Sequence, residues 1–165
     1  RLNSFTGFFL YIVNMINEVI EEVLNDYGEL IVEAIIQSLS DADRVATGRT
    51  ADSVSYRVEG STLTVEGRDS IMTLEYGRSP TGQGTGSGGG ASGSFFQQIV
   101  EWVEAKGIET GAAWAIYKKI NEEGFEGTPG VISEPVDRLI LKMEAEIEYR
   151  IEQSIDLKIE SLFNS

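Results

Sequence analysis

The first quarter of the chain places its apolar residues with the period of an α-helix. Between Tyr11 and Leu39 they recur at steps of three and four residues, and polar or acidic residues fill most of the other positions. The apolar positions that define the pattern are Ile12, Ile16, Val19, Val23, Tyr27, Leu30 and Ala34. Residues at this spacing share one face of a helix, so the pattern predicts a long amphipathic helix. Gly28 should weaken this helix, because glycine is a poor helix former.

The next apolar pattern has a period of two. In "SVSYRVEGSTLTVEG", residues 53–67, apolar residues alternate with polar ones on both sides of the dipeptide Gly60-Ser61. Two alternating runs around such a dipeptide predict a β-hairpin. One face of the hairpin should pack on the N-terminal helix, because alternation specifies a single buried side. That face consists of Val54, Tyr56, Val58, Leu63 and Val65.

A third strand is expected at "SIMTLEY", residues 70–76. Its alternation puts Met72, Leu74 and Tyr76 on one face. Together with the hairpin it would form a small antiparallel sheet with one apolar side, which a helix can cover. The fold class is therefore expected to be α+β.

Three helical segments follow a glycine-rich stretch in the second half of the chain. Two of them end at Gly107 and Gly124, and glycine is the usual residue just past a helix end. The last begins near Pro135, which suits the first turn of a helix. It continues for about 28 residues, or roughly 40 Å. Its apolar residues are Val136, Ile140, Met143, Ile147, Ile151, Ile155, Ile159 and Leu162.

These patterns predict a single domain over residues 1–165. Its length and its hydrophobic content of 41% are enough to bury a core. The expected parts are an N-terminal helical segment (1–45), an antiparallel sheet (46–77), a Gly-rich loop (78–94), a helical pair with its loop (95–134) and a C-terminal helix (135–165).

Charge and composition exclude several classes of function. The chain has 27 acidic and 13 basic residues, a net charge of −14, so its surface should repel the phosphates of DNA. It has no Cys and no His, which excludes disulfides, zinc sites with thiolate or imidazole ligands, and nucleophiles paired with histidine.

The N-terminal stretch "FTGFFLYIVNMI" is strongly apolar, but it is only about half as long as a membrane span. It also lacks the basic leader and cleavage site of a signal peptide, so neither a membrane location nor secretion is expected. Because such a stretch is too apolar to face water on a monomer, we expect Phe5, Phe8 and Phe9 to contact another subunit or another protein.

The segment between Gly82 and Gly93 contains seven glycines. It is not a phosphate-binding loop, because no Lys-Ser or Lys-Thr follows the last glycine. We expect residues 79–94 to form a docking loop that becomes ordered on contact with a partner, because Gly-rich backbone loses much entropy on ordering. Arg78 at its beginning and Phe95 and Phe96 at its end are the expected anchors.

The remaining candidates for chemistry are carboxylates and aromatic residues. Glutamates of the predicted helices are expected on solvated faces, and Asp41 and Asp43 lack the downstream Gly and Glu of a calcium loop. Trp102 and Trp114 have the helical spacing of core or interface residues. We therefore expect no enzyme activity, no catalytic residues, no metal and no cofactor.

Two segments together resemble the bacteriophage tail-completion or head-tail joining proteins. They are "ATGRTADSVSYRVEGSTLTVEG", residues 46–67, and "LEYGRSP", residues 74–80. In that family a "TG-x-L-x-x-S-I" segment opens a hairpin, and an "E-[YF]-G-T" ending leads into a long loop. The matching positions are Thr47, Gly48, Ser53, Val54, Glu75, Tyr76 and Gly77. Thr50 departs from the family pattern, which has an apolar residue there, and "TPGVISEPVD" stands where the family commonly has a Pro-Phe turn.

The resemblance implies a structural virion protein of the neck or tail that is made in the host cytoplasm. Such a subunit forms a homo-oligomeric ring beside portal, connector or tail proteins, and DNA passes through the ring without specific binding. Two alternatives remain open: a non-enzymatic protein that binds a partner through its amphipathic helices, and a hydrolase that uses carboxylates alone.

Overall fold

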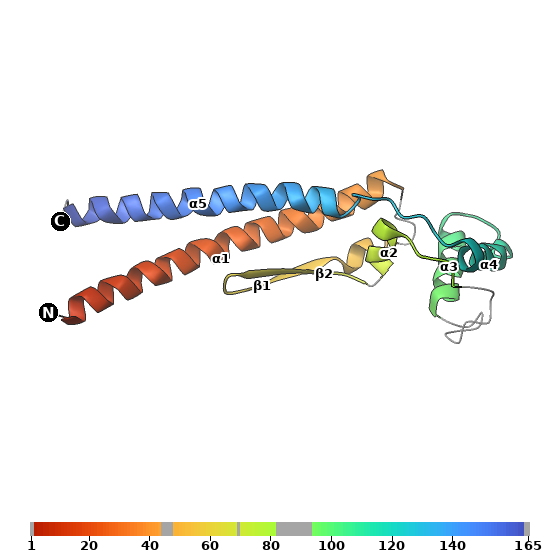
Figure 1. Cartoon of the computed structure of the whole chain (residues 1–165), viewed down its shortest axis with the longest axis horizontal. Coiled ribbons are helices and arrows are strands. Elements are labelled where there is room, and N and C mark those ends of the chain that lie inside the picture. Colours follow the sequence, from red (N-terminus) through yellow and green to blue (C-terminus); the bar gives the residue numbers. More distant parts are fainter. Residues whose placement is uncertain (1, 44–47, 69, 82–93, 164–165) are drawn as a thin grey trace. The chain divides into compact units, whose positions relative to one another are not determined.

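The computed structural model describes residues 2–43, 48–68, 70–81 and 94–163, and it has the expected α+β composition (Figure 1). By its internal contacts the chain divides into two compact units. Unit 1 comprises Arg1–Ala34, Ser55–Glu66 and Glu134–Ser165, and unit 2 comprises Ile35–Val54 and Gly67–Ser133. In chain order the elements are α1 (Leu2–Asp41), a 3₁₀ turn (Ala51–Ser53), β1 (Ser55–Glu59), β2 (Thr62–Glu66), α2 (Ser70–Tyr76), α3 (Ser94–Ala105), α4 (Ala112–Glu123) and α5 (Ser133–Phe163).

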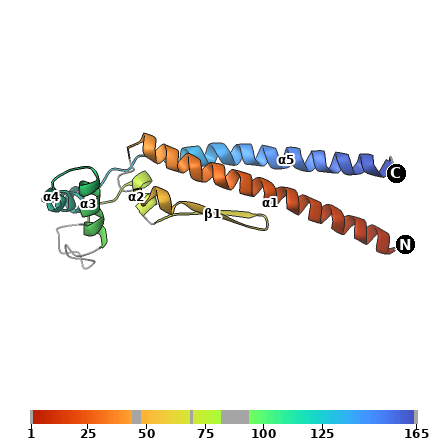
Figure 2. The ribbon, with the colours of Figure 1, turned by 180° about the vertical axis from the view of Figure 1, so that it is seen from behind.

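Unit 1 is built around α1, which lies between the β1–β2 hairpin and α5 (Figures 1 and 2). The predicted amphipathic helix is confirmed, and its most buried residues in this unit are Val23, Leu24 and Ile31. Leu30, which the sequence placed on the buried face, is 44% exposed instead. Because the hairpin and α5 cover two different sides of α1, a single apolar stripe does not describe its buried surface.

The helix continues without a break through Gly28, where the sequence suggested a weakness. Gly28 is buried under the ring of Tyr56, and a Cβ at this position would lie 2.6 Å from Tyr56 Cε2, well inside contact distance. The missing side chain is therefore the feature that lets the hairpin approach α1. Burial and the neighbouring carboxylate of Glu29 raise the pKa of the Tyr56 hydroxyl, which lies 3.5 Å from Glu29 Oε1.

The hairpin has the predicted turn and register. β1 and β2 are antiparallel, with Tyr56 opposite Val65 and Val58 opposite Leu63. Gly60 has a φ of +60°, a conformation that glycine adopts without strain in a two-residue hairpin turn. Tyr56, Val58 and Leu63 are half-buried as predicted, whereas Val65 is 37% exposed. Val54 is buried but precedes the strand and belongs to unit 2.

The predicted third strand is wrong, because residues 70–76 form helix α2. Among the described residues the sheet has only β1 and β2. Burial in α2 follows the helical spacing of Ile71, Leu74 and Glu75, whereas Met72 and Tyr76 are exposed. In a segment of only seven residues, the same apolar positions can fit both the period of a strand and the period of a helix. The alternation of Met72 and Tyr76 therefore led to the wrong prediction.

Unit 2 contains the predicted helical pair α3 and α4. Their apolar faces meet around Ile99, Val103 and Ala113, which are all buried. Gly107 and Gly124 follow the two helices with φ of +67° and +85°, so both predicted helix ends are confirmed. The expected position of Pro135 in the first turn of α5 is confirmed as well.

The contact between Gly28 and Tyr56 leads to a stability prediction. Gly28→Ala removes a poor helix former, which alone would stabilise α1 by about 1 kcal/mol. We expect the variant instead to be about 1–2 kcal/mol less stable in urea unfolding, because the new methyl group overlaps the Tyr56 ring. In a Tyr56→Ala background the same substitution should become stabilising. A gain in stability with Tyr56 intact would contradict this packing.

Candidate assembly interface

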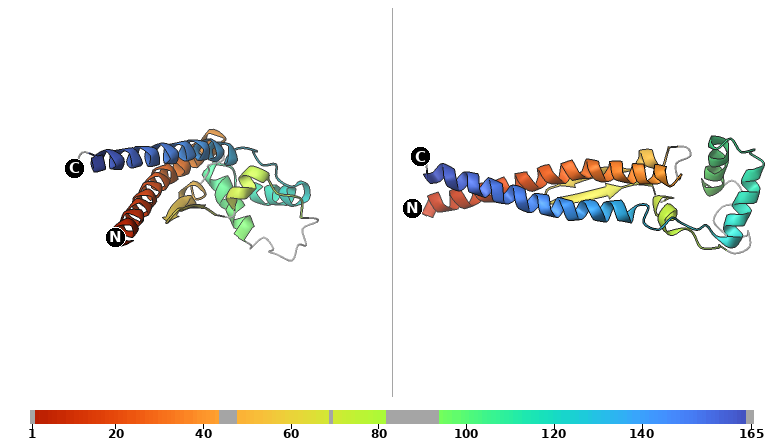
Figure 3. Two further views of the ribbon diagram at one scale, coloured as in Figure 1. Left: turned by 60° about the vertical axis from the view of Figure 1, so that its left-hand side comes forward. Right: turned by 90° about the horizontal axis from the view of Figure 1, so that it is seen from above.

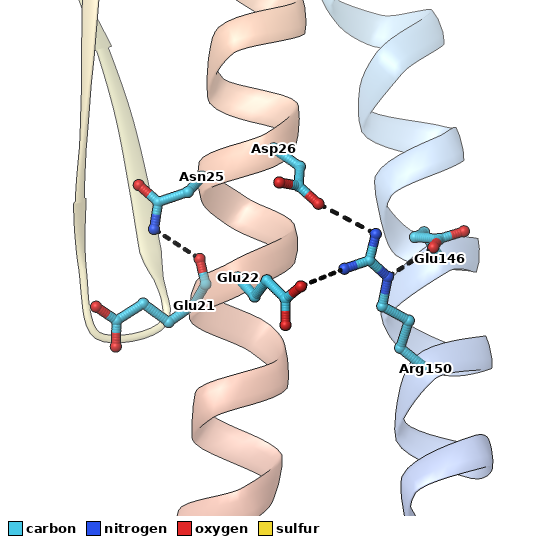
Figure 4. Close-up of polar contacts among 6 residues, drawn as sticks. All are labelled: Glu21, Glu22, Asn25, Asp26, Glu146 and Arg150. Atoms are coloured by element: carbon cyan, nitrogen blue, oxygen red, sulfur yellow. Dashed lines mark hydrogen bonds and ion pairs between the residues drawn. The ribbon is translucent and has the colours of Figure 1, made fainter.

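Arg150 joins the two long helices of unit 1 (Figure 4). Its Nη1 lies 3.3 Å from Glu22 Oε1 and its Nη2 lies 3.1 Å from Asp26 Oδ2, both on α1. Its Nε lies 2.7 Å from Oε1 of Glu146, one turn earlier on α5. The hydrogen bond to Glu146, supported by Asp26, raises the pKa of the guanidinium despite its partial burial. The planar guanidinium thus binds carboxylates of both helices at once. Its several N–H donors suit it to this role.

Beyond Arg150 the two helices expose large apolar side chains at the end of unit 1 that holds both chain ends (Figures 1 and 2). Tyr11 on α1 and Lys158 on α5 are in contact there, with Nζ 4.4 Å from the ring centre. We call this end the arm tip. Its exposed apolar residues are Phe9, Leu10, Tyr11, Leu157, Ile159 and Phe163.

Three predicted interface residues belong to the N-terminal part of α1. Phe9 is 65% exposed and lies in the arm tip. The backbone of Phe5 and Phe8 is part of α1, but their side chains lie outside the described part of the structure. Of the three residues, Phe9 is therefore the one whose side chain is seen to be exposed and accessible to a partner.

Phe95, Phe96 and Arg78, the other predicted anchors, lie together within unit 2. The guanidinium carbon of Arg78 is 4.2 Å from the centre of the Phe95 ring. Phe95 and Phe96 are half-buried against the α3–α4 core, and Phe96 packs edge-on against Tyr117 and Trp114. These contacts within one chain already use much of both rings. Trp114, which stacks on Tyr117, is the more open aromatic residue at 54% exposure.

The residues of "LEYGRSP" fix the segment after α2 to the loop that precedes α5. Gly77 has a φ of +76°, and a Cβ there would lie 2.7 Å from Gly127 N, so no larger residue fits without movement. Arg78 and Phe125 exchange two backbone hydrogen bonds, of 2.7 and 2.8 Å. The glycine in the motif thus permits a close approach of two backbones.

Glu75 in the same motif is a buried carboxylate with a full set of donors. Its Oε2 accepts hydrogen bonds from the backbone N–H groups of Ile132 (2.7 Å) and Ser133 (3.0 Å), and its Oε1 accepts one from the Ser133 hydroxyl. Burial alone would raise the pKa of Glu75. The hydrogen bonds from Ser133, Ile132 and Gly130 outweigh this effect and lower the pKa below its usual value.

The first motif fixes the base of the hairpin. Gly48 has a φ of +76°, and its carbonyl accepts a hydrogen bond from the N–H of Asp52 (2.7 Å). The hydroxyl of Ser53 donates to the carbonyl of Thr50 and accepts from the N–H of Arg68, so it links the two ends of the hairpin. Thr47 lies outside the described residues. Gly48 and Ser53 of the first motif, like Glu75 and Gly77 of the second, thus fix the course of the backbone.

The remaining sequence expectations have mixed outcomes. Residues 82–93 of the expected docking loop lie outside the described part, whereas Thr81 at its beginning is held by Asn121 through its N–H (3.0 Å) and its hydroxyl (2.9 Å). Glu101 pairs with Arg49, and Glu122 is 3.7 Å from Lys118, so not all helical glutamates are merely solvated.

Within the described part of the chain, no group of three or more acidic, His or Cys residues is placed to hold a metal ion. No helix described in the structure is long and apolar enough to span a membrane.

The sequence reasoning missed Arg150 and the C-terminal contribution to the arm tip. A signal for Arg150 was present, because it is the only basic residue between Lys142 and Lys158 in an otherwise acidic helix. The residues Leu157 and Phe163 could have been noticed as apolar positions on a helix with an acidic outer face.

Comparison with known proteins identifies no relative. No family model matches the chain, and neither a curated protein nor a solved structure is significantly similar to it.

The buried carboxylate predicts a pH-dependent stability. Because its folded-state pKa is lowered, Glu75 stabilises the fold above the usual Glu pKa of 4.5, and this contribution is lost as the pH falls through the lower folded-state value. At neutral pH, Glu75→Gln should cost about 1.5–3 kcal/mol in urea unfolding. The variant should also lose less of its remaining stability on acidification. Glu126→Gln, at an exposed site, is the control, and an equal effect of both variants would refute the role of Glu75.

Arg150→Gln should weaken the pairing of α1 and α5. It leaves Glu22, Asp26 and Glu146 without their shared cation, and we expect a loss of about 1 kcal/mol at low salt. The loss should shrink at high salt, because salt screens the remaining carboxylates. Arg138→Gln is the matched control, since the Arg138 side chain is exposed and donates to a backbone carbonyl. Equal, salt-independent losses in both variants would argue against the ion pairs.

Proposed function

We propose that this chain is a structural subunit of a bacteriophage neck or tail, a ring-forming head-tail connector or tail-completion protein. The proposal combines the family resemblance with the order of the elements along the chain. The resemblance implies an N-terminal helix, a small sheet and a C-terminal helix in that order, and α1, the β1–β2 hairpin and α5 follow this order along the chain. The subunit needs no cofactor and has no catalytic role in this proposal.

The observation that carries the proposal is the structural role of the two motifs. Gly48 and Ser53 form the hairpin base, and Glu75, Gly77 and Arg78 hold the loop before α5. Residues with such roles are retained when a backbone is retained and surfaces diverge. The resemblance therefore concerns residues that determine the fold of the subunit. Such residues support a fold in common with the phage proteins more strongly than similar surface residues would.

Unit 1 has features that suit an assembly subunit. The hairpin has two strands and no further partner strand among the described residues, so each strand has an open edge. The exposed apolar side chains of the arm tip would favour association in water. Identical subunits that meet head to tail through such surfaces form a ring when the rotation between neighbours closes on itself, and an open filament when it does not.

The charge of the chain suits a passage for DNA. At a net charge of −14, the protein repels the phosphate backbone rather than binding it. A ring lined by such subunits would let the duplex slide through without holding it. The same charge argues against a role in gripping or recognising DNA.

Electron microscopy of the purified chain, alone and with the proteins encoded beside it, tests the proposal. We expect closed rings of one subunit number with a central channel wide enough for a DNA duplex. In a retention assay at low salt, double-stranded DNA should not bind to these rings. Particles without rotational symmetry in both preparations would contradict the proposal. Tight binding to one host protein by a chain that stays monomeric would favour the partner-binding alternative.

A further inference from the structure

The arm tip combines two properties that do not occur together elsewhere in the described part of unit 1. Large apolar side chains are also exposed at Leu141 and Tyr149 of α5, but there they lie among charged residues. The tip exposes large apolar side chains from two helices, with Phe9, Leu157 and Phe163 exposed to 65, 67 and 85%. It is also nearly free of charge on α1, because no charged residue occurs between Leu2 and Asn17. From Glu18 to Glu33, by contrast, α1 carries six acidic residues and no basic one.

This distribution of charge decides where two copies of the chain can meet. Unit 1 as a whole has sixteen acidic residues against six basic ones, so two copies repel each other over most of its surface. The repulsion is weaker at the α1 side of the tip, which has no charged residue from Leu2 to Asn17, and burial of the exposed apolar side chains there would favour association. An acidic membrane surface would be repelled by the same carboxylates.

The helices are arranged so that the tip is open to a neighbour. α1 and α5 are joined at Arg150 but diverge toward the chain ends, as the views in Figures 1 and 3 agree. At the tip the contact between them is made by the long side chain of Lys158 over Tyr11. The apolar residues on either side of this contact do not bury one another within one copy.

We propose that the arm tip is a self-association surface, on which the α1 end of one copy packs against the α5 end of the next copy. This inference rests on the proposed function, because it names the surface through which neighbouring subunits of the ring would meet. Phe9 and Leu157 are its central residues, one from each helix.

Cysteine cross-linking tests the contact directly, because the chain has no cysteine of its own. In an equimolar mixture of the single variants Phe9→Cys and Leu157→Cys, every cross-link made by a short bismaleimide must join two copies. We expect dimers cross-linked between the two variants in at least roughly tenfold higher yield than for a mixture of Phe9→Cys with Tyr149→Cys, since neighbouring tips raise the effective concentration of the thiols. Tyr149 is the control because it is 57% exposed on α5 within the acidic part of the helix.

A second variant separates association from folding. Phe9→Ser combined with Leu157→Ser should weaken self-association at least about tenfold in sedimentation experiments, because it removes two apolar side chains from the contact. Its helix content by circular dichroism should be unchanged, since both residues are exposed in one copy. Equal cross-linking at the tip and at position 149 would overturn the inference, as would unchanged association of the double variant.

The outcomes also distinguish this inference from the proposed function. If rings form without cross-links at the tip, the tip contact is refuted but the proposed ring-forming function is not. Tip cross-links in a chain that never exceeds a dimer would support the contact and refute the ring. Recovery of the chain with lipid vesicles containing phosphatidylserine, in place of tip cross-links, would assign the surface to a membrane and overturn the inference.

Discussion

The pairing of α1 with α5 through Arg150 is the interaction on which the arrangement of unit 1 depends. The three carboxylates around this guanidinium come from segments more than a hundred residues apart, since Arg150 and Asp26 are separated by 124 positions. Both helices are strongly acidic, so without a shared cation they would repel each other where they run side by side. In the close-up, α5 lies on one side of α1 and the hairpin on the other (Figure 4).

A different physical solution holds unit 2 together. There the backbones of two distant segments approach closely, at Gly77 and Gly127, and a buried carboxylate binds the N–H groups of the turn before α5. A buried charge is tolerated only when it is well supplied with hydrogen bonds, and Glu75 has them from three neighbouring residues. Glu75 and Gly77 of the segment "LEYGRSP" are therefore explained by the requirements of this junction.

Much of the fold could be predicted from local patterns. The long helices, the hairpin with its turn at Gly60 and the helix ends at Gly107 and Gly124 all follow from periodicity and glycine chemistry. The segment 70–76 could not be assigned in this way, because its apolar residues fit a strand as well as a short helix and tertiary contacts of Glu75 decide between them. The same applies to Gly28, whose role depends on Tyr56 in another element.

The candidate interface was less predictable than the fold. From the sequence, the apolar stretch that contains Phe9 was predicted to be an interface. Phe95 and Phe96 were predicted to be interface residues as well, but they pack largely within their own unit. Apolar composition alone does not distinguish a side chain buried in its own domain from one that awaits a partner. The pairing of α1 with α5 is a tertiary property, so only the structure shows that Leu157 and Phe163 are exposed at the same end of unit 1 as Phe9.

The central claim is that identical copies of this chain close into a ring, and the mass of the assembly tests it most directly. Native mass spectrometry of the purified protein, alone and with the proteins encoded beside it, measures that mass without assumptions about shape. The account predicts a single oligomer with a fixed number of subunits above two. A chain that remains a monomer of 18.1 kDa in both preparations would contradict it.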